Sequence, residues 1–169
     1  REYACFVLEP ILANCGCTPP ENDYLGKIRE ICTKTGTVLV FDEIVTGFRI
    51  NIGGAQNFYG ITPDMATFSK AIASGLPLSM VCGKKEIMEQ FIPTGEVFFA
   101  GTFNGHPLSL FVAKTVINKL KNPDFYFGNE KFGEDFRKYV TDQIIEFKIP
   151  ACVQGIGSMS TIAFGCKSF

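Results

Sequence analysis

The sequence predicts an α/β fold, and three observations support this prediction. Short apolar runs, among them YACFVL at residues 3–8 and VLVF at residues 38–41, are typical of buried strands. Between them, residues 24–32 carry apolar side chains at helical spacing. A strand, a helix and a second strand within about forty residues indicate a right-handed parallel crossover.

The middle of the chain predicts two more strands and a short helix. Gly36 stands where the helix over residues 24–32 is expected to end. The segments DMATFS at residues 64–69 and LSMVCG at residues 78–83 predict short strands. Residues 84–91 suit a short helix.

The last third of the chain predicts two amphipathic helices. Pro107 is expected in the first turn of one of them. The apolar residues that share one face of that helix are Leu108, Phe111, Val112, Val116 and Leu120. The second helix is expected to run through residues 132–147. STIAFGCKSF at residues 160–169 alternates like a strand, and because both ends of the sequence read as strands, we expect a piece of a larger fold.

Composition predicts a soluble, cytoplasmic protein. The 169 residues are 46% apolar and 20% charged, which is typical of one globular domain. A net charge of −1 provides no long-range positive field, so nucleic acid and anionic membranes are not expected as partners. The apolar runs are too short to cross a bilayer.

Seven cysteines form an odd set without CxxC spacing. Several lie in apolar runs, so we expect reduced cysteines in the core of an intracellular protein. The single histidine, His106, leaves Cys15 and Cys17 without a second pair of zinc ligands. No metal site is expected.

Charged residues follow two of the predicted strands, where ligands bind in open α/β sheets. Asp42 and Glu43 come directly after VLVF, and Lys70 follows DMATFS and precedes small residues. Each of these charges alone is more often a solvated loop residue. Together, Asp42 and Lys70 fit pyridoxal phosphate chemistry, which needs an amine that forms a Schiff base and a carboxylate at the pyridine nitrogen.

Three motifs carry a resemblance to a known family. They are VLVFDEIVTGFR, GGAQNFYGITPDMATFSKAIASGLPLSMVCGKKEIM and AGTFNGHPLSL, in this order along the chain. Together they resemble the class III pyridoxal-phosphate aminotransferases. Within that class, GFRINIGGAQNFYGITPD and EPILANCGCTPP are most similar to the glutamate-1-semialdehyde 2,1-aminomutases.

The resemblance implies the large domain of a fold-type I pyridoxal-phosphate transferase, with a mostly parallel sheet and helices on both faces. Residues 1–121 correspond to the C-terminal part of the cofactor-binding large domain. Residues 122–169 correspond to its end and to the start of a truncated small domain. The family's upstream phosphate-binding loop has no counterpart in this sequence, so the chain alone is expected to be inactive.

The same resemblance implies roles for five residues. Lys70 forms the Schiff base with pyridoxal 5'-phosphate and then moves a proton, while Asp42 pairs with the pyridinium nitrogen. Ile44 packs on one ring face, and Asn14 contacts cofactor or substrate. Thr102 reaches the phosphate in the partner subunit, which implies a homodimer. An ordinary core isoleucine, a turn-forming asparagine and a residue before a helix start remain the alternatives for Ile44, Asn14 and Thr102.

Four other polar residues receive structural interpretations. Glu9 and Glu43 are expected to stabilise loops. Arg49 is expected in a structural ion pair, with a fork for a substrate carboxylate as the alternative. His106 is expected at a helix start.

The resemblance implies amino-group transfer on a small amino or keto substrate, in the aminomutase version from glutamate 1-semialdehyde to 5-aminolevulinate. The lysine turn has Ala73 and Ser74 where the family usually has glycines, which keeps a second hypothesis open. This hypothesis is a class III transaminase acting on an amino sugar, polyketide or ω-amino compound. A non-catalytic fragment of such an enzyme is the third hypothesis.

Overall fold

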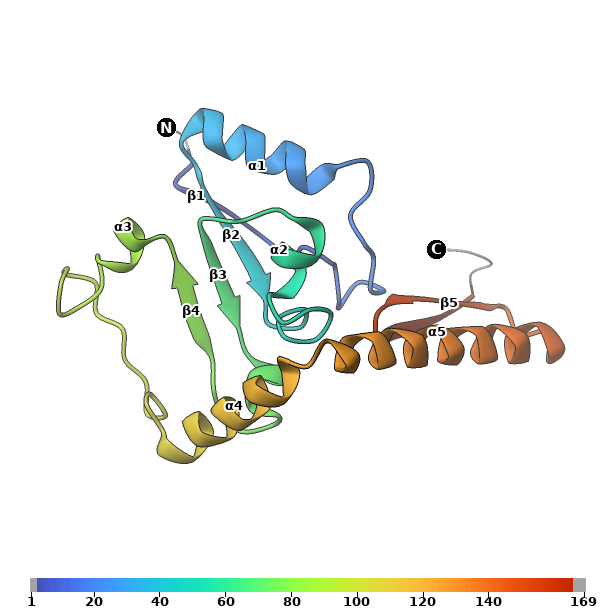
Figure 1. The fold of residues 1–169 in the computed structure, drawn as a ribbon. Helices are drawn as coiled ribbons and strands as arrows, with labels where there is room; N and C mark the ends of the chain where they lie inside the picture. The colour runs from blue at the N-terminus through green and yellow to red at the C-terminus, as the bar shows by residue number, and fades with distance from the viewer. Residues whose placement is uncertain (1–2, 166–169) are drawn as a thin grey trace.

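The structure, a computed structural model, describes residues 3–165 and contains a four-stranded sheet and a separate hairpin (Figure 1). The sheet order is β1-β2-β3-β4, with β1 (Cys5–Leu8), β2 (Val38–Glu43), β3 (Met65–Phe68) and β4 (Met80–Gly83). The first three strands are parallel, and β4 is antiparallel to β3. The predicted α/β fold with a mostly parallel sheet is therefore confirmed.

Helix α1 (Tyr24–Thr35) connects β1 to β2, as predicted. Gly36 ends the helix in the left-handed conformation, with φ 66°, and its N–H donates to the carbonyls of Cys32 and Thr33. Glycine adopts this conformation without the steric cost that a Cβ atom adds.

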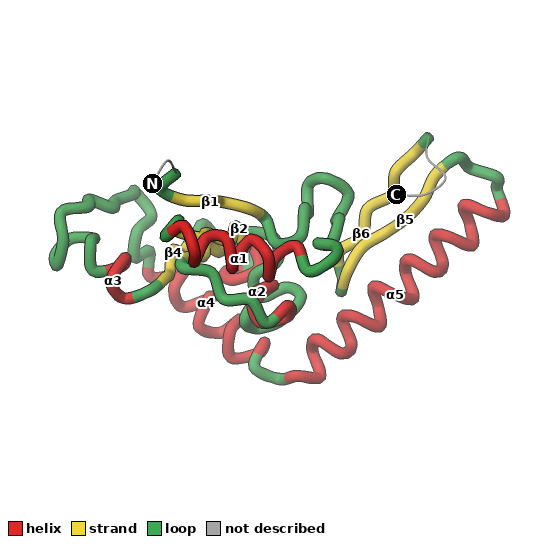
Figure 2. Tube along the Cα trace, turned by 90° about the horizontal axis from the view of Figure 1, so that it is seen from above, coloured by secondary structure: helices red, strands yellow, loops and turns green. Residues whose placement is uncertain are grey.

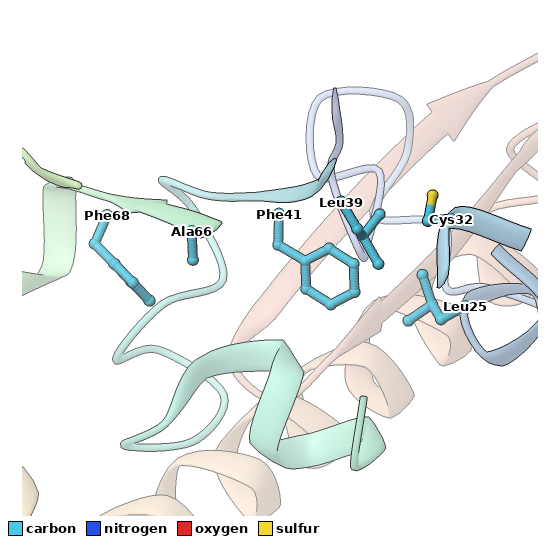
Figure 3. Packing of buried hydrophobic residues seen from close by; sticks show 6 residues of the cluster. All are labelled: Leu25, Cys32, Leu39, Phe41, Ala66 and Phe68. Carbon is cyan, nitrogen blue, oxygen red and sulfur yellow. The ribbon is translucent and has the colours of Figure 1, made fainter. Parts of the chain in front are cut away.

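One face of the sheet carries the core, which Figure 3 shows. Along β2, Leu39, Phe41 and Glu43 are buried, whereas the alternate residues are half-buried. The core cluster comprises Leu25, Cys32, Leu39, Phe41, Ala66 and Phe68. Helix α1 and helix α2 (Gly54–Tyr59) both pack against this cluster. These two helices thus share one face of the sheet.

Strand β1 is correctly predicted as a strand, but its predicted burial is wrong. Phe6 and Val7 are 39% and 60% exposed. The strand lies at the edge of the sheet and pairs only with β2 among the described residues. Sequence pattern alone does not show whether a neighbour covers an edge strand.

Helix α4 (Pro107–Leu120) begins as predicted, but its predicted apolar face is only partly buried. Leu108 and Phe111 are exposed, whereas the residues it buries are Ser109, Ala113 and Leu120. Ala113 packs on the 3-10 helix η1 (Lys70–Ala73), so small side chains mediate this approach. The Nδ1 atom of His106 accepts a hydrogen bond from the N–H of Ser109, which confirms His106 as the residue that starts the helix.

The last part of the described chain is a long helix with a hairpin beside it (Figures 1 and 2). Helix α3 (Lys85–Met88) precedes α4, and α5 (Pro123–Glu146) follows it. Strands β5 (Ala151–Ile156) and β6 (Met159–Phe164) form the antiparallel hairpin. The division predicted between residues 121 and 122 falls between α4 and α5 and stays a prediction.

The expectation of buried, reduced cysteines is only partly correct. Cys17 and Cys32 are buried free thiols. Cys152 is disulfide-bonded, and the exposed free thiols are Cys5, Cys15 and Cys82. Cys166 lies outside the described residues. Between residues 3 and 165, no helix is long and apolar enough to cross a membrane.

Candidate active site

The carboxyl ends of β1, β2 and β3 lie at one edge of the sheet. Leu8 pairs with Phe41, and Asp42 pairs with Thr67. Because the three strands are parallel, the segments that follow them share this edge. The edge therefore brings together the loop after β1, the acidic end of β2 and the lysine turn after β3, as the sequence predicted.

Asp42 lies at the end of β2, on the face opposite to the buried Phe41. Its Oδ1 atom accepts a hydrogen bond from the N–H of Ile44 at 3.0 Å, and Thr67 Oγ1 lies at 3.5 Å. No described residue bonds its Oδ2 atom. The carboxylate is thus oriented by the backbone and keeps one oxygen available for a ligand cation.

Lys70 begins η1, two residues after β3 ends. Its φ of 43° places it in the left-handed region, which non-glycine residues rarely adopt. Such strained positions cluster at functional sites. The Oγ atom of Ser69 donates to the carbonyl of Leu78 at 2.8 Å and fixes the turn. The Lys70 side chain is exposed and has no ion-pair partner among the described residues.

A cavity of about 690 Å³ lies beside Lys70. Its charged lining residues are Arg49, Lys70 and Lys119, and no acidic residue lines it. The ion pair predicted for Arg49 does not form within residues 3–165; its Nε atom donates instead to the carbonyl of Val45 at 2.9 Å. The cavity therefore suits an anionic group better than a cationic one.

Glu43 and Glu9 have the structural roles that the sequence predicted. Glu43 is fully buried and accepts hydrogen bonds from the Thr46 hydroxyl and from two N–H groups at the start of α2, those of Ala55 and Gln56, at 2.7–2.9 Å. Glu9 accepts from the N–H of Ala13 at 3.1 Å. Strand alternation thus separates a buried glutamate that holds α2 from its neighbour Asp42, which faces the other side.

The other three predicted site residues are placed around this edge but not in the Lys70 cavity. Ile44 is half-buried just after β2, and Asn14 is exposed in the loop after β1. Thr102 is exposed in the turn that precedes α4. Neither these residues nor Asp42 line the cavity beside Lys70. The described chain therefore brings Asp42 and Lys70 to neighbouring strand ends without direct contact.

Sequence reasoning missed the side chains that hold the Asn14 loop. The Nε2 atom of Gln154 donates to the carbonyl of Gly16 at 2.6 Å and lies 3.3 Å from Thr18 Oγ1. The sequence separation between Gln154 and Gly16 is 138 residues. No local pattern signals a contact of this length.

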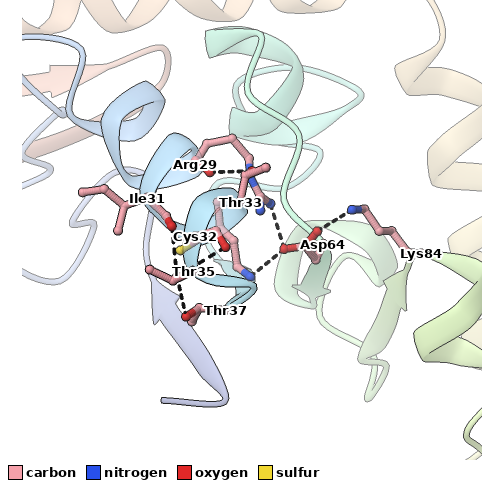
Figure 4. A network of polar contacts seen from close by, with 9 residues as sticks. Arg29, Ile31, Cys32, Thr33, Thr35, Thr37, Asp64 and Lys84 are labelled. Carbon is pink, nitrogen blue, oxygen red and sulfur yellow. Dashed lines mark hydrogen bonds and ion pairs between the residues drawn. The ribbon is translucent and has the colours of Figure 1, made fainter. Parts of the chain in front are cut away.

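A second charged cluster surrounds Asp64, just before β3 (Figure 4). Its carboxylate pairs with Arg29 at 2.8 Å and Lys84 at 2.7 Å, and accepts from the N–H of Leu39 at 2.7 Å. Burial acts to raise the pKa of Asp64, but the hydrogen bonds from Lys84, Leu39 and Arg29 outweigh it and lower the pKa to about 2. This carboxylate is fully engaged in joining α1, β2 and β4.

These features define an α/β domain with a lysine and an oriented carboxylate at the ends of neighbouring parallel strands. The family model described as aminotransferase class-III matches residues 1–168. The chain therefore belongs to the class III aminotransferase family.

Curated relatives and solved structures agree with this assignment. The chain is 42% identical over 166 residues to the glutamate-1-semialdehyde 2,1-aminomutase of Methanococcus vannielii, covering 98% of this chain and 39% of that protein. It is 42% identical to the protein of the same name from Caldicellulosiruptor bescii, covering 98% and 39%. The chain thus spans about two fifths of the length of these relatives.

Among solved structures, an ω-transaminase from Sphaerobacter thermophilus superposes with a TM-score of 0.87 at 32% identity, covering 95% of this chain and 37% of that one. A β-phenylalanine aminotransferase from Variovorax paradoxus gives a TM-score of 0.85 at 30% identity, covering 99% and 39%. A transaminase solved with PLP bound gives 0.86 at 26% identity, covering 95% and 38%.

Proposed function

We propose that the protein carrying this chain is a pyridoxal-phosphate-dependent aminomutase that converts glutamate 1-semialdehyde to 5-aminolevulinate. The observation that carries the proposal is the position of Lys70 and Asp42 at neighbouring strand ends, in a chain 42% identical to glutamate-1-semialdehyde 2,1-aminomutases. In either direction of the reaction, the substrate is a small molecule that carries both an amino group and a carbonyl group.

The residues present fit pyridoxal 5'-phosphate. Asp42 has an oriented carboxylate with an oxygen that no described group occupies, which suits the protonated ring nitrogen. Lys70 has an exposed amine with no acidic partner in the described chain. The cofactor, when bound, supplies the electron sink for bond breaking at the substrate carbon.

The chain's own residues then have distinct tasks. The Lys70 amine would hold the cofactor and would move a proton at the substrate carbon. Asp42 keeps the ring nitrogen protonated, and Ile44 packs against the ring. Asn14 contacts the cofactor or substrate from the loop after β1. Thr102 contacts the cofactor phosphate of a second copy, so the active protein is a homodimer.

The remaining parts of the proposal concern organisation. Residues 1–121 belong to the large, cofactor-binding domain, and residues 122–169 complete it and start the small domain. The protein acts in the cytoplasm. The described chain alone lacks part of the site and is expected to be inactive.

The test is an assay of the protein that carries this chain, supplied with pyridoxal 5'-phosphate. The expected result is that 5-aminolevulinate forms from glutamate 1-semialdehyde and that this formation is lost in the Lys70→Ala variant. Amino-group exchange with ω-amino or β-amino acids, without 5-aminolevulinate, contradicts the aminomutase and favours the transaminase hypothesis. Cofactor binding without either reaction contradicts both.

A further inference from the structure

We propose that the β5–β6 hairpin is a clamp that positions the Asn14 loop at the active-site edge, with Gln154 as its main positioning residue. This inference rests on the proposed function, because Asn14 matters for the reaction only if the edge binds the cofactor. The clamp itself is a structural claim with a readout that does not need the cofactor.

The Asn14 loop, residues 12–18, is closed at its base and exposed at its tip. Leu12 and Thr18 exchange backbone hydrogen bonds at 3.0 and 3.3 Å, and the N–H of Cys15 donates to the carbonyl of Leu12. Asn14 and Cys15 are exposed, whereas Cys17 is only 6% exposed. The backbone after Asn14 is therefore the part that another element must hold.

Two residues of the hairpin contact this part of the loop. Gln154 on β5 and Thr161 on β6 pair directly across the hairpin, so their side chains point to the same face. Gln154 donates to the carbonyl of Gly16, and Thr161 Oγ1 lies 3.3 Å from the Cys17 sulfur. Two facing side chains thus contact consecutive residues of the loop.

Apolar packing also joins the hairpin to the base of the Asn14 loop. Met159 of β6 shares a buried cluster with Ile11, Cys17, Ile50 and Ala55. Ile11 is fully buried at the base of the loop. The hairpin therefore contacts the loop with a polar pair and with its own core residue.

Helix α5 fixes the hairpin in turn. Arg137 Nη1 donates to the carbonyl of Gly157 at 2.8 Å and lies within 3.3 Å of Met159 O and Ser160 Oγ. Gly133 allows this close approach, because a Cβ atom there would lie 1.8 Å from the Gly157 oxygen. The hydroxyl of Tyr126 on the same helix donates to the carbonyl of Phe48, which lines the Lys70 cavity. One helix thus connects the clamp to the lysine side of the edge.

Each test variant removes one polar group with which the hairpin contacts the Asn14 loop. Gln154→Met keeps the length of the side chain and removes the amide donor. Thr161→Val keeps the shape and removes the hydroxyl. Gln143→Met, on α5, is the matched control, because the Gln143 amide contacts only Glu146.

The first readout is the alkylation rate of Cys17, followed by peptide mass spectrometry in the protein that carries this chain, without cofactor. Gln154→Met is expected to raise the rate about fivefold, since one lost hydrogen bond is worth about 1 kcal/mol. Thr161→Val is expected to raise it less, and Gln143→Met to leave it unchanged. Equal Cys17 rates in wild type and Gln154→Met, with thermal unfolding confirming that both are folded, overturn the clamp.

The second readout is the dissociation constant of pyridoxal 5'-phosphate, read from its absorbance band. Gln154→Met and Asn14→Ala are each expected to weaken binding several-fold, and the double variant is expected to bind no more weakly than Asn14→Ala alone. Fully additive effects overturn the positioning role, since Gln154 then acts independently of Asn14. A wild-type protein that binds no cofactor overturns the proposed function, while the Cys17 rates still decide the clamp.

Discussion

The two residues that flank strand β3 behave in opposite ways. Asp64, before the strand, has three strong partners and a carboxylate that is fully engaged. Lys70, after the strand, has a positive φ, an exposed amine and no described ion-pair partner. A saturated charge fixes neighbouring elements to one another, whereas an unpaired charge on a fixed backbone is free to act on a ligand. Asp64, before β3, therefore has a structural role, whereas Lys70, after β3, is the candidate for chemistry.

The neighbours Asp42 and Glu43 repeat this contrast within one strand. Glu43 is buried with three hydrogen bonds, whereas Asp42 keeps an oxygen unbonded within the described chain. Because successive side chains of a strand point to opposite faces, adjacent carboxylates serve different purposes.

The largest expected effect comes from removing the unpaired amine. Lys70→Ala is expected to lower amino-transfer activity by about 10³-fold or more, because the proposed function assigns the proton transfer to the Lys70 amine. Its unfolding free energy is expected to change little, since the exposed side chain has no ion-pair partner among the described residues and alanine keeps the same backbone strain. Steady-state assays and urea unfolding check both parts, with Lys138→Ala on the exposed side of α5 as the control lysine. Retained activity in Lys70→Ala would contradict the functional difference between Lys70 and Asp64.

Removing the saturated carboxylate is expected to have the reverse effect. Asp64→Ala leaves Arg29 and the N–H of Leu39 without their partner, and is expected to cost about 3 kcal/mol of unfolding free energy. Residual folded protein should keep its specific activity. Urea unfolding measures the loss, with Asp135→Ala on the exposed side of α5 as the control. A loss below about 0.5 kcal/mol, the range of ordinary surface changes, contradicts a structural role for Asp64.

Replacing the carboxylate of Asp42 by a neutral amide tests the difference between the two faces of β2. Asp42→Asn keeps the acceptor for the N–H of Ile44 but loses the charge that holds a protonated ring nitrogen. Activity is expected to fall about 10²-fold with little change in stability. Glu43→Gln is the matched change on the buried side and is expected to affect stability instead. Equal losses of activity in the two variants, at equal stability, would remove the distinction between the faces of β2.

Acid titration gives the smallest expected effect. The ordinary pKa of the Asp64 carboxyl is 3.8, and its partners lower the pKa in the folded state to about 2. The unfolded chain therefore binds the proton first, and the contribution of Asp64 is fully present above pH 3.8 and is lost as the pH falls through 2. It amounts to about 2 kcal/mol. Asp64→Asn should remove this part of the pH dependence of urea unfolding; an identical pH profile in the variant argues against it.

Much of the fold and the edge of the site could be predicted from local pattern. A continuous apolar run predicted β2, weak alternation predicted β3, and Gly36 predicted a helix end. The order of strands and helix placed Asp42 and Lys70 at one edge. These features depend on residues close in sequence, whose spacing is fixed by strand and helix geometry.

What the sequence did not reveal depends on distant neighbours. The exposed Phe111 reads as core because its apolar character says nothing about which face α4 presents to η1. Arg49 was predicted to form an ion pair, but no carboxylate among the described residues lies within ion-pair distance of it. Gln154 received no prediction from the sequence, although it holds a loop 138 residues away.

The most direct test of the account is the site at which pyridoxal 5'-phosphate attaches. The protein that carries this chain is incubated with the cofactor, reduced with borohydride and digested, and the labelled peptides are identified by mass spectrometry. The account predicts one stoichiometric label on Lys70 and almost none on Lys84, which is paired with Asp64, or on the more exposed Lys85. Label spread across the exposed lysines without preference for Lys70 would contradict it.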